Sequence, residues 1–332
     1  MAAWHEMTGL QLGEAIADGS IDPVELATFF LDRIVAEDPG KRIFIRMDPQ
    51  RTQAEAEAAQ ARRRAGLRRG PLDGVPVSWK DLADVAGVET TMATRALKGR
   101  VPKTDALLLS RATHAGTVFL GKTNMTEFAF SGLGINTTHE TPANACDTEV
   151  ERIPGGSSSG AGVAVARGLG PIAIGSDTGG SVRIPASLNG ITGLKTTIGA
   201  LPLDGVLPLS PLLDTIGPLT ADVGDAAAMW SVLAGRPMAD LSGVDLKGRL
   251  FVAVADSLWS DVDPGVDRAC RAAAAKLEAA GAAVEWHDVP ELAESMEAMI
   301  SMGGLVTTDA WSCWSDLIDN DPDAIFPPML PR

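Results

Sequence analysis

The sequence predicts an α/β protein, because segments with helical patterns alternate with short apolar segments of the strand type. A capped amphipathic helix predicted over 104–116 is followed at once by a predicted strand at 117–121. Further along, a strand at 249–255, a helix at 263–280 and a strand at 283–289 make a βαβ-like unit. Helices and strands that alternate in this way pack as layers around a sheet.

We expect one continuous domain over 1–332, because no internal repeat or low-complexity segment divides the chain. Glycine and serine dominate residues 155–193, where small side chains let backbones approach closely. The βαβ-like unit, about 248–290, should flank this segment rather than form it.

The N-terminal part contains two predicted helices and one strand. Asp22-Pro23-Val24-Glu25 supplies an N-cap, a proline at the first helical position and a glutamate three residues after the cap, so a helix should run to about Glu37. Residues 53–64 are rich in alanine, glutamate and arginine and indicate a second helix. The apolar segment 74–79 indicates a buried strand that ends at Lys80.

The composition of the chain argues against several classes of function. The chain has 28 Lys+Arg against 43 Asp+Glu, and a net charge of -15 repels nucleic-acid phosphates and anionic lipid. No apolar run approaches the roughly 20 residues that span a bilayer, and the three scattered cysteines fit a reducing compartment. The histidines and cysteines lack metal-ligand spacing. We therefore expect a cytoplasmic protein without nucleic-acid or membrane partners, metal or cofactor.

Three features together suggest acyl transfer from an amide: Lys80, the run 155–160 and the run 175–183. That chemistry needs a nucleophile, a base and donors for the oxyanion, and serine and lysine supply the first two without histidine. Burial beside Val75, Val77 and Trp79 would favour a neutral, basic lysine. Consecutive amides in 178–181 would supply the oxyanion donors.

These segments resemble the amidase signature family over about 71–218, with weaker similarity to Pro290. The matching residues, in family order, are Gly74 to Asp81, Gly121 to Phe128, Pro154 to Gly160, Gly175 to Pro185, Gly193 to Lys195 and Leu213 to Pro218. The resemblance implies an open, mixed and twisted β-sheet with helices on both faces. Its C-terminal part is short here, since family members usually continue well past this length and supply sheet strands and a pocket wall, so the chain is either a fragment or a short form.

The resemblance places the family's triad on Lys80, on Ser157 in a cis peptide bond with Gly156, and on the nucleophile Ser181. The two serines keep the family's separation of 24 residues, which selects Ser157 as the relay over Ser158 or Ser159. The resemblance further implies three groups of residues: oxyanion donors at Thr178, Gly179, Gly180 and Ser181; supporting hydrogen bonds from Ser159, Asp177 and Arg183; and pocket positions at Met125, Phe130, Gly132 and His139.

The implied activity is hydrolysis of linear amides through an acyl-enzyme, with esters and carbamates as further substrate classes. One alternative is the glutamine-hydrolysing member of a tRNA-dependent amidotransferase, which shares the signature and passes ammonia to a partner. Another is a catalytically inactive binding protein, which retention of all three triad residues disfavours. A homodimer stays open. The sequence departs from the family pattern at Trp79 and at Lys195-Thr196, and neither departure replaces a residue of the triad.

Other motifs point elsewhere but lack the required context. Residues 156–160 satisfy the Gly-x-Ser-x-Gly of a nucleophile elbow with Ser158 as nucleophile, yet the preceding residues 151–154 are polar and end in proline. Residues 168–173 mimic a dinucleotide fingerprint but follow a predicted helix and contain Pro171. In the C-terminal part, we expect Met299, Met302, Trp311 and Trp314 to pack in the core, because their spacing is helical, and a role in the substrate pocket is the alternative.

Overall fold

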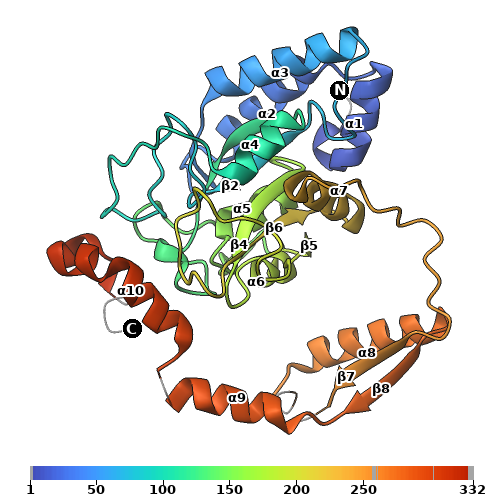
Figure 1. Ribbon diagram of the computed structural model, residues 1–332, viewed down its shortest axis with the longest axis vertical. Coiled ribbons are helices and arrows are strands. Elements are labelled where there is room, and N and C mark those ends of the chain that lie inside the picture. Colours follow the sequence, from blue (N-terminus) through green and yellow to red (C-terminus); the bar gives the residue numbers. More distant parts are fainter. Residues whose placement is uncertain (1–2, 256–258, 260, 302, 328–332) are drawn as a thin grey trace. The chain divides into compact units, whose positions relative to one another are not determined.

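The computed structural model describes residues 3–255, 259, 261–301 and 303–327 (Figure 1). Contacts divide the chain into two units, the first comprising 1–239 with 309–332 and the second 240–308. The single domain expected over 1–332 stays a prediction, and each unit is described by itself.

A six-stranded sheet forms the centre of the first unit. Its strands in spatial order are β1 (Phe44–Arg46), β3 (Val118–Thr123), β2 (Pro76–Lys80), β4 (Ile172–Asp177), β6 (Thr215–Thr220) and β5 (Thr192–Gly193). Strand β2 pairs in parallel with β3 and with β4, and the remaining pairs are antiparallel. The sheet is therefore mixed and open, with β1 and β5 at its edges, which confirms the predicted architecture.

The central strands are buried along their whole length. Such strands are covered on both sides, which agrees with their apolar sequences. Because the carboxyl ends of parallel strands meet at one edge, Lys80, Thr123 and Asp177 end neighbouring strands on the same side of the sheet. This edge brings Lys80 close to the Gly/Ser-rich segment.

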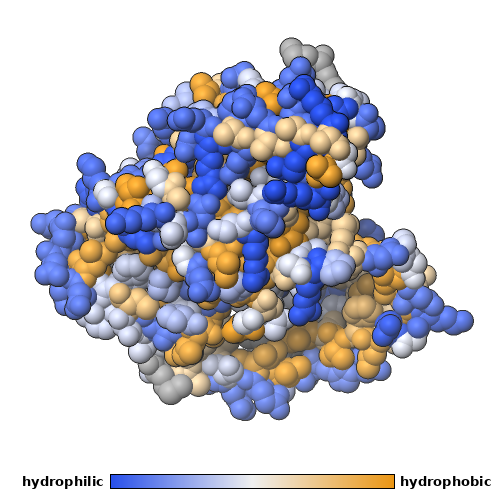
Figure 2. Space-filling model, turned by 45° about the horizontal axis from the view of Figure 1, so that its top comes forward, coloured by the Kyte–Doolittle hydropathy of each residue, from blue (hydrophilic) through white to orange (hydrophobic). Residues whose placement is uncertain are grey.

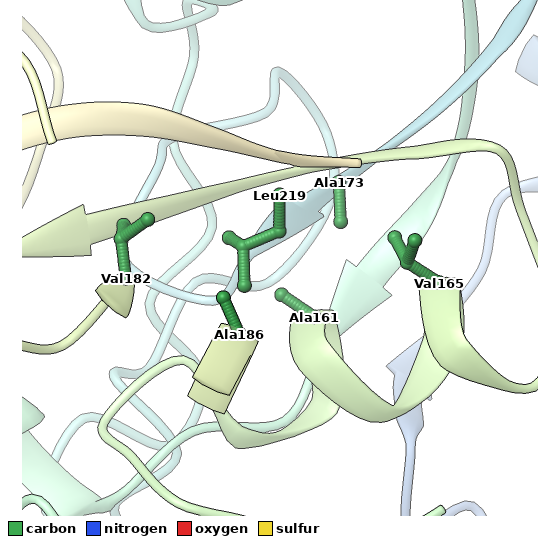
Figure 3. Close-up of a cluster of buried hydrophobic side chains, with 6 residues drawn as sticks. All are labelled: Ala161, Val165, Ala173, Val182, Ala186 and Leu219. Atoms are coloured by element: carbon green, nitrogen blue, oxygen red, sulfur yellow. The ribbon is translucent and has the colours of Figure 1, made fainter. Parts of the chain in front are cut away.

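One face of the sheet is covered by α5 (Ser159–Ala166) and α6 (Arg183–Leu188). Figure 3 shows the apolar cluster that joins these helices to β4 and β6, formed by Ala161, Val165, Ala173, Val182, Ala186 and Leu219. The small alanines of this cluster, Ala161 on α5 and Ala173 on β4, let α5 lie close to the sheet, which sets the position of the residues just before α5.

The opposite face is covered by other helices, as side-chain alternation along β4 requires. Ile172 lies beside Gly9 of α1, whereas the next residue, Ala173, belongs to the α5 cluster. Helix α7 packs on α1, α4 and β6, and α2 and α3 pack on each other and on β3. The bounds of these elements are η1 Trp4–Glu6, α1 Gly9–Asp18, α2 Pro23–Glu37, α3 Pro49–Arg64, α4 Leu107–His114, η2 Glu127–Ala129 and α7 Val223–Ala234.

Several local predictions for this unit are confirmed. The Asp22 side chain accepts a hydrogen bond from the amide of Val24 and Pro23 opens α2, which ends at Glu37 as expected. The predicted helices at 53–64 and 104–116 and the strands at 74–79 and 117–121 are present as α3, α4, β2 and β3, with ends that differ by a few residues.

The second unit contains the predicted βαβ arrangement. Strands β7 (Leu250–Val254) and β8 (Ala283–His287) are parallel and are joined through α8 (Pro264–Ala279). The helix begins after the N-cap Asp263, whose side chain accepts from the amide of Gly265. Helices α9 (Pro290–Ser301) and α10 (Leu305–Asn320) follow, and then η4 (Pro322–Ala324); the chain from Asp309 onward belongs to the first unit.

The predicted burial of the C-terminal helical residues is wrong for two of them. Met299 is 53% exposed and Trp311 is 52% exposed. Figure 2 shows that hydrophobic residues in general lie among hydrophilic ones on the visible surface. Trp314 is half-buried, packs its ring on Phe128 and donates its indole N–H to the carbonyl of Pro208. Met302 lies outside the described residues. Helical spacing identified a helix but not which of its sides is covered.

Candidate active site

Lys80 is placed at the carboxyl end of β2, in the middle of the sheet, where its side chain is 1% exposed. Its Nζ donates hydrogen bonds to Ser157 Oγ at 2.6 Å and to Ser176 Oγ at 2.8 Å. Within the described residues no carboxylate forms an ion pair with Lys80, and the side chains that its Nζ contacts directly are hydroxyl groups.

This environment lowers the pKa of Lys80 from 10.5 to about 7. The cause is burial, which removes water from the ammonium, and the negative charges of Asp214 and Asp177 oppose the shift only in part. Near pH 7, Lys80 is therefore a neutral amine in a substantial fraction of the molecules, and the neutral amine is the form that can accept a proton.

Ser157 is held by backbone contacts in the loop before α5. The peptide bond between Gly156 and Ser157 is cis, as the resemblance implies. The Gly156 amide donates to the carbonyl of Gly132 at 2.8 Å, and the Ser157 carbonyl accepts from the amide of Thr126 at 3.0 Å. A Cβ at position 156 would come within 2.6 Å of Thr126 Oγ1 and of a backbone nitrogen, so only glycine fits there.

The two serines that follow Ser157 make different contacts. Ser158 donates its hydroxyl hydrogen to the carbonyl of Ser176, and its amide donates to the carbonyl of Ser181 at 3.2 Å. That second contact brings the backbone of Ser181 beside the Ser157 loop. The Ser159 hydroxyl is buried at the start of α5 and forms no hydrogen bond within the described residues. The part of the chain that the structure describes therefore gives no support for a hydrogen bond from the Ser159 hydroxyl, and the supporting role of Ser159 stays a prediction.

Asp177 organises the turn that contains Ser181. Its buried carboxylate accepts hydrogen bonds from the amides of Gly180 and Val182 and, at 3.0 and 2.9 Å, from the guanidinium of Arg183. Burial alone would raise the pKa of Asp177, but these hydrogen bonds outweigh it and lower the pKa. The structure thus brings Asp177 and Arg183 together at the positions expected to support the site.

One predicted oxyanion donor is already engaged. The Gly180 amide donates to Asp177 at 2.8 Å, so the expectation of a free donor at Gly180 is corrected. By contrast, Gly179 is exposed with open space beside its Cα, and Ser181 follows two residues later. Neither of those two amides donates a hydrogen bond within the described part of the chain. Gly179 and Ser181 are therefore the better placed donors.

Thr178 is held by a neighbouring loop rather than by its own turn. Its hydroxyl donates to one oxygen of Asp214, whose second oxygen accepts from the amides of Leu209 and Ser210. Burial raises the pKa of Asp214, although these hydrogen bonds and the charge of Lys80 oppose the rise. The Thr178–Asp214 contact links the start of the predicted oxyanion segment to residues 209–214.

The predicted pocket residues lie in the segment between β3 and α5, but their environments differ. Met125 is completely buried, whereas Phe130 and His139 are half-buried. Burial lowers the pKa of His139, and the charge of Arg46 adds to this, so the ring is neutral at neutral pH. Gly132 contributes its carbonyl to the Gly156 amide, a role that was not predicted.

Two site residues have contacts that the sequence did not indicate. Ser176 accepts a hydrogen bond from Lys80, and Asp214 accepts one from Thr178. Both residues stand within matched segments, directly before Asp177 and within 213–218, so their position in those segments was the available signal.

Comparison with known proteins identifies the family to which this chain belongs. A profile described as Amidase matches residues 25–325, and the chain therefore belongs to the amidase family. Among curated relatives, the A chain of the glutamyl-tRNA(Gln) amidotransferase of Symbiobacterium thermophilum is 37% identical over 306 residues, covering 88% of this chain and 62% of the relative. Its counterpart in Acidothermus cellulolyticus is 40% identical over 238 residues, covering 72% of this chain and 47% of the relative. The chain thus spans less than two thirds of the length of these relatives.

Solved structures of amidases are similar along nearly the whole chain. A crystal structure of an amidase matches with a TM-score of 0.86 and 33% identity, covering 97% of this chain and 71% of that one. The peptide amidase from Stenotrophomonas maltophilia matches with a TM-score of 0.83 and 32% identity, covering 96% and 69%. The glutamyl-tRNA(Gln) amidotransferase component from Thermotoga maritima matches with a TM-score of 0.77 and 29% identity, covering 94% and 67%.

Two further features concern only the part of the chain that the structure describes. No group of three or more His, Cys, Asp or Glu side chains there is arranged to hold a metal ion. None of the helices described is both long and apolar enough to cross a bilayer.

Proposed function

We propose that this chain hydrolyses carboxylic amides through an acyl-enzyme on Ser181, with Ser157 as proton relay and Lys80 as base. The observation that carries the proposal is the 2.6 Å contact between Lys80 Nζ and Ser157 Oγ, made by a lysine whose pKa burial lowers to about 7. A lysine kept charged by a carboxylate could not accept a proton at neutral pH. Membership of the amidase family supports the same reaction class.

The proposed first half-reaction forms an ester and releases an amine. The Ser181 proton passes to Ser157 Oγ, whose own proton passes to neutral Lys80, while Ser181 Oγ bonds to the amide carbonyl carbon. The oxyanion that develops is stabilised by backbone amides, for which Gly179 and Ser181 are the candidates. When the carbon–nitrogen bond breaks, Ser157 gives a proton to the leaving nitrogen and regains one from Lys80.

The second half-reaction regenerates the serine. Water loses a proton through Ser157 to Lys80 and adds to the acyl carbon, and the ester bond to Ser181 Oγ breaks as that oxygen takes a proton back. Asp177 and Arg183 act as positioning residues, because their ion pair fixes the turn between β4 and α6. Ester and carbamate carbonyls are compatible with the same steps.

A second candidate function is that of the glutamine-hydrolysing component of a tRNA-dependent amidotransferase. The observation that favours it is the identity of 36–40% with curated amidotransferase components of this kind from several bacteria. Such a component would perform the same acyl chemistry on the side-chain amide of glutamine, but the ammonia would go to a partner. The two candidates differ in substrate and in dependence on another chain, not in the triad.

The experiment that tests the proposal has two parts. A fluorophosphonate probe should add its phosphonyl group to Ser181, located by peptide mass spectrometry, and the Ser181→Ala variant should remain unlabelled. Ammonia or amine release should then be measured for a panel of simple amides, peptide amides and glutamine, with and without added partner proteins. Failure of the wild-type chain to react with the probe would leave only the inactive binding protein.

A further inference from the structure

A cavity of about 790 Å³ lies in the first unit, between the C-terminal ends of α4 and α7 and the loop 69–72. Both helices lie on the face of the sheet opposite to α5 and α6 (Figure 1), so the cavity is separate from the Lys80 site. Part of its lining is apolar, including Leu72, Ala228, Val232 and Met238. A volume of this order matches sites that take small organic ligands.

The charged part of the lining is basic. It contains Arg69, Arg111 and Arg236, while no aspartate or glutamate lines the cavity. Arg69 donates to the carbonyl of His114 and Arg111 to the carbonyl of Leu233, each at 2.9 Å, so both guanidiniums are held at helix ends. None of the three arginines forms an ion pair with any described residue, and each retains N–H groups for a further acceptor.

This positive charge stands out in a chain whose net charge is -15. Residues 62–70 contain five arginines and no acidic residue. The adjacent acidic residue, Asp73, is buried and already bound by Arg62 and by the amide of Arg69. The charge on the cavity arginines is therefore not compensated by that carboxylate.

We propose that the cavity binds a small organic anion with an apolar body and a carboxylate, sulfonate or phosphate head. The guanidiniums would bind the head, since their paired N–H groups match planar and tetrahedral oxyanions. The apolar lining would bury the body of the ligand. A nucleic-acid backbone fits less well, because it offers charge but nothing to occupy the apolar recess.

Binding of octanoate to the purified full chain, measured by isothermal titration calorimetry, tests the proposal, with 1-octanol and inorganic phosphate as separate ligands. Octanoate should bind one site and bind at least tenfold more tightly than either control ligand. The Arg69→Glu/Arg236→Glu variant should weaken octanoate binding at least tenfold. The matched control is Arg64→Glu, which removes an exposed arginine of the same basic segment that does not line the cavity.

A second variant separates shape from charge. Ser110 lines the cavity and is exposed on α4, so Ser110→Trp should fill the recess and abolish octanoate binding without changing any charge. The circular dichroism spectrum should stay unchanged in every variant, because the fold is retained. The rate of amide hydrolysis should stay unchanged as well, because the Lys80 site is separate from the cavity. The proposal would be overturned if 1-octanol or phosphate bound as tightly as octanoate. It would also be overturned if Arg64→Glu weakened octanoate binding as much as the double variant does, or if Ser110→Trp still bound octanoate. The proposal would fail as well if octanoate did not bind, or if the arginines bound tRNA that octanoate does not displace.

Discussion

Ser210 donates a hydrogen bond of 2.5 Å to the carboxylate of Asp309, and this contact joins α10 to the loop that contains Asp214. Asp214 in turn accepts the hydroxyl of Thr178 at the start of the predicted oxyanion segment. A continuous series of contacts therefore connects α10, which is far along the chain, with the turn that contains Ser181.

Removal of this connection should reduce both stability and turnover. The Asp309→Ala variant loses a hydrogen bond to a charged group and leaves Ser210 without its acceptor, at a cost of about 1–2 kcal/mol in unfolding free energy. We expect kcat to fall several-fold, because Asp214 and Thr178 lose their support. Thermal unfolding and steady-state kinetics would measure the two effects. Asp316→Ala, a change on the same helix, is the control, and equal behaviour of the two variants would refute the connection.

Substitutions in the proposed triad should separate the relay from its neighbours. We expect Lys80→Ala, Ser157→Ala and Ser181→Ala each to lower kcat by on the order of 10³-fold or more, because each removes a member of one proton path. Ser158→Ala should be milder, since that hydroxyl donates only to a backbone carbonyl. Amide hydrolysis under saturating substrate is the measurement. A loss for Ser158→Ala as large as that for Ser157→Ala would contradict the assignment of the relay.

The rate of acyl transfer should rise with pH around neutrality. Lys80 accepts a proton only when neutral, and its pKa is about 7 because its ammonium is buried. The rate should therefore increase from about pH 6 to 8 and then level off. The pH dependence of kcat/KM for a neutral amide would show this limb. A profile that is flat from pH 6 to 9 in a chemistry-limited reaction would argue against lysine as the base.

The same burial should make Lys80 a source of instability at neutral pH. The unfolded chain, in which the lysine pKa is near 10.5, binds more protons than the folded one between about pH 7 and 10. Stability from this group consequently rises with pH across that window and is lowest below pH 7. Lys80→Met should unfold at a higher temperature than the wild type at pH 7, and the gain should shrink toward pH 10. Thermal unfolding curves of the wild type and Lys80→Met at three pH values between 7 and 10 would test this dependence. Lys98→Met is the surface control, and an equal gain in that variant would contradict the prediction.

Much of the fold and part of the site could be predicted because their signals are local. The N-cap and proline of Asp22-Pro23 define the start of α2, and the apolar segment before Lys80 defines a buried strand. Proximity of Lys80 to Ser157 followed from the resemblance, and the 2.6 Å contact agrees with it. The catalytic roles of Lys80, Ser157 and Ser181 stay predictions until activity is measured.

The missed contacts depend on how strands and loops meet. Ser176 reaches Lys80 because β2 and β4 are parallel with Trp79 opposite Ile174, a register that no local pattern encodes. The engagement of Gly180 by Asp177 depends on the exact geometry of one turn. Exposure of Trp311 could not be foreseen either, because helical spacing does not reveal which side of a helix finds a partner.

The contact between the Gly132 carbonyl and the Gly156 amide has a consequence for how members of this family could diversify. The loop expected to select the substrate is also the loop that fixes the peptide bond before Ser157. Mutations that remodel this loop for a new substrate would shift the proton relay as well. Changes of specificity should therefore arise more readily through side chains that leave the loop backbone in place than through insertions or deletions around position 132.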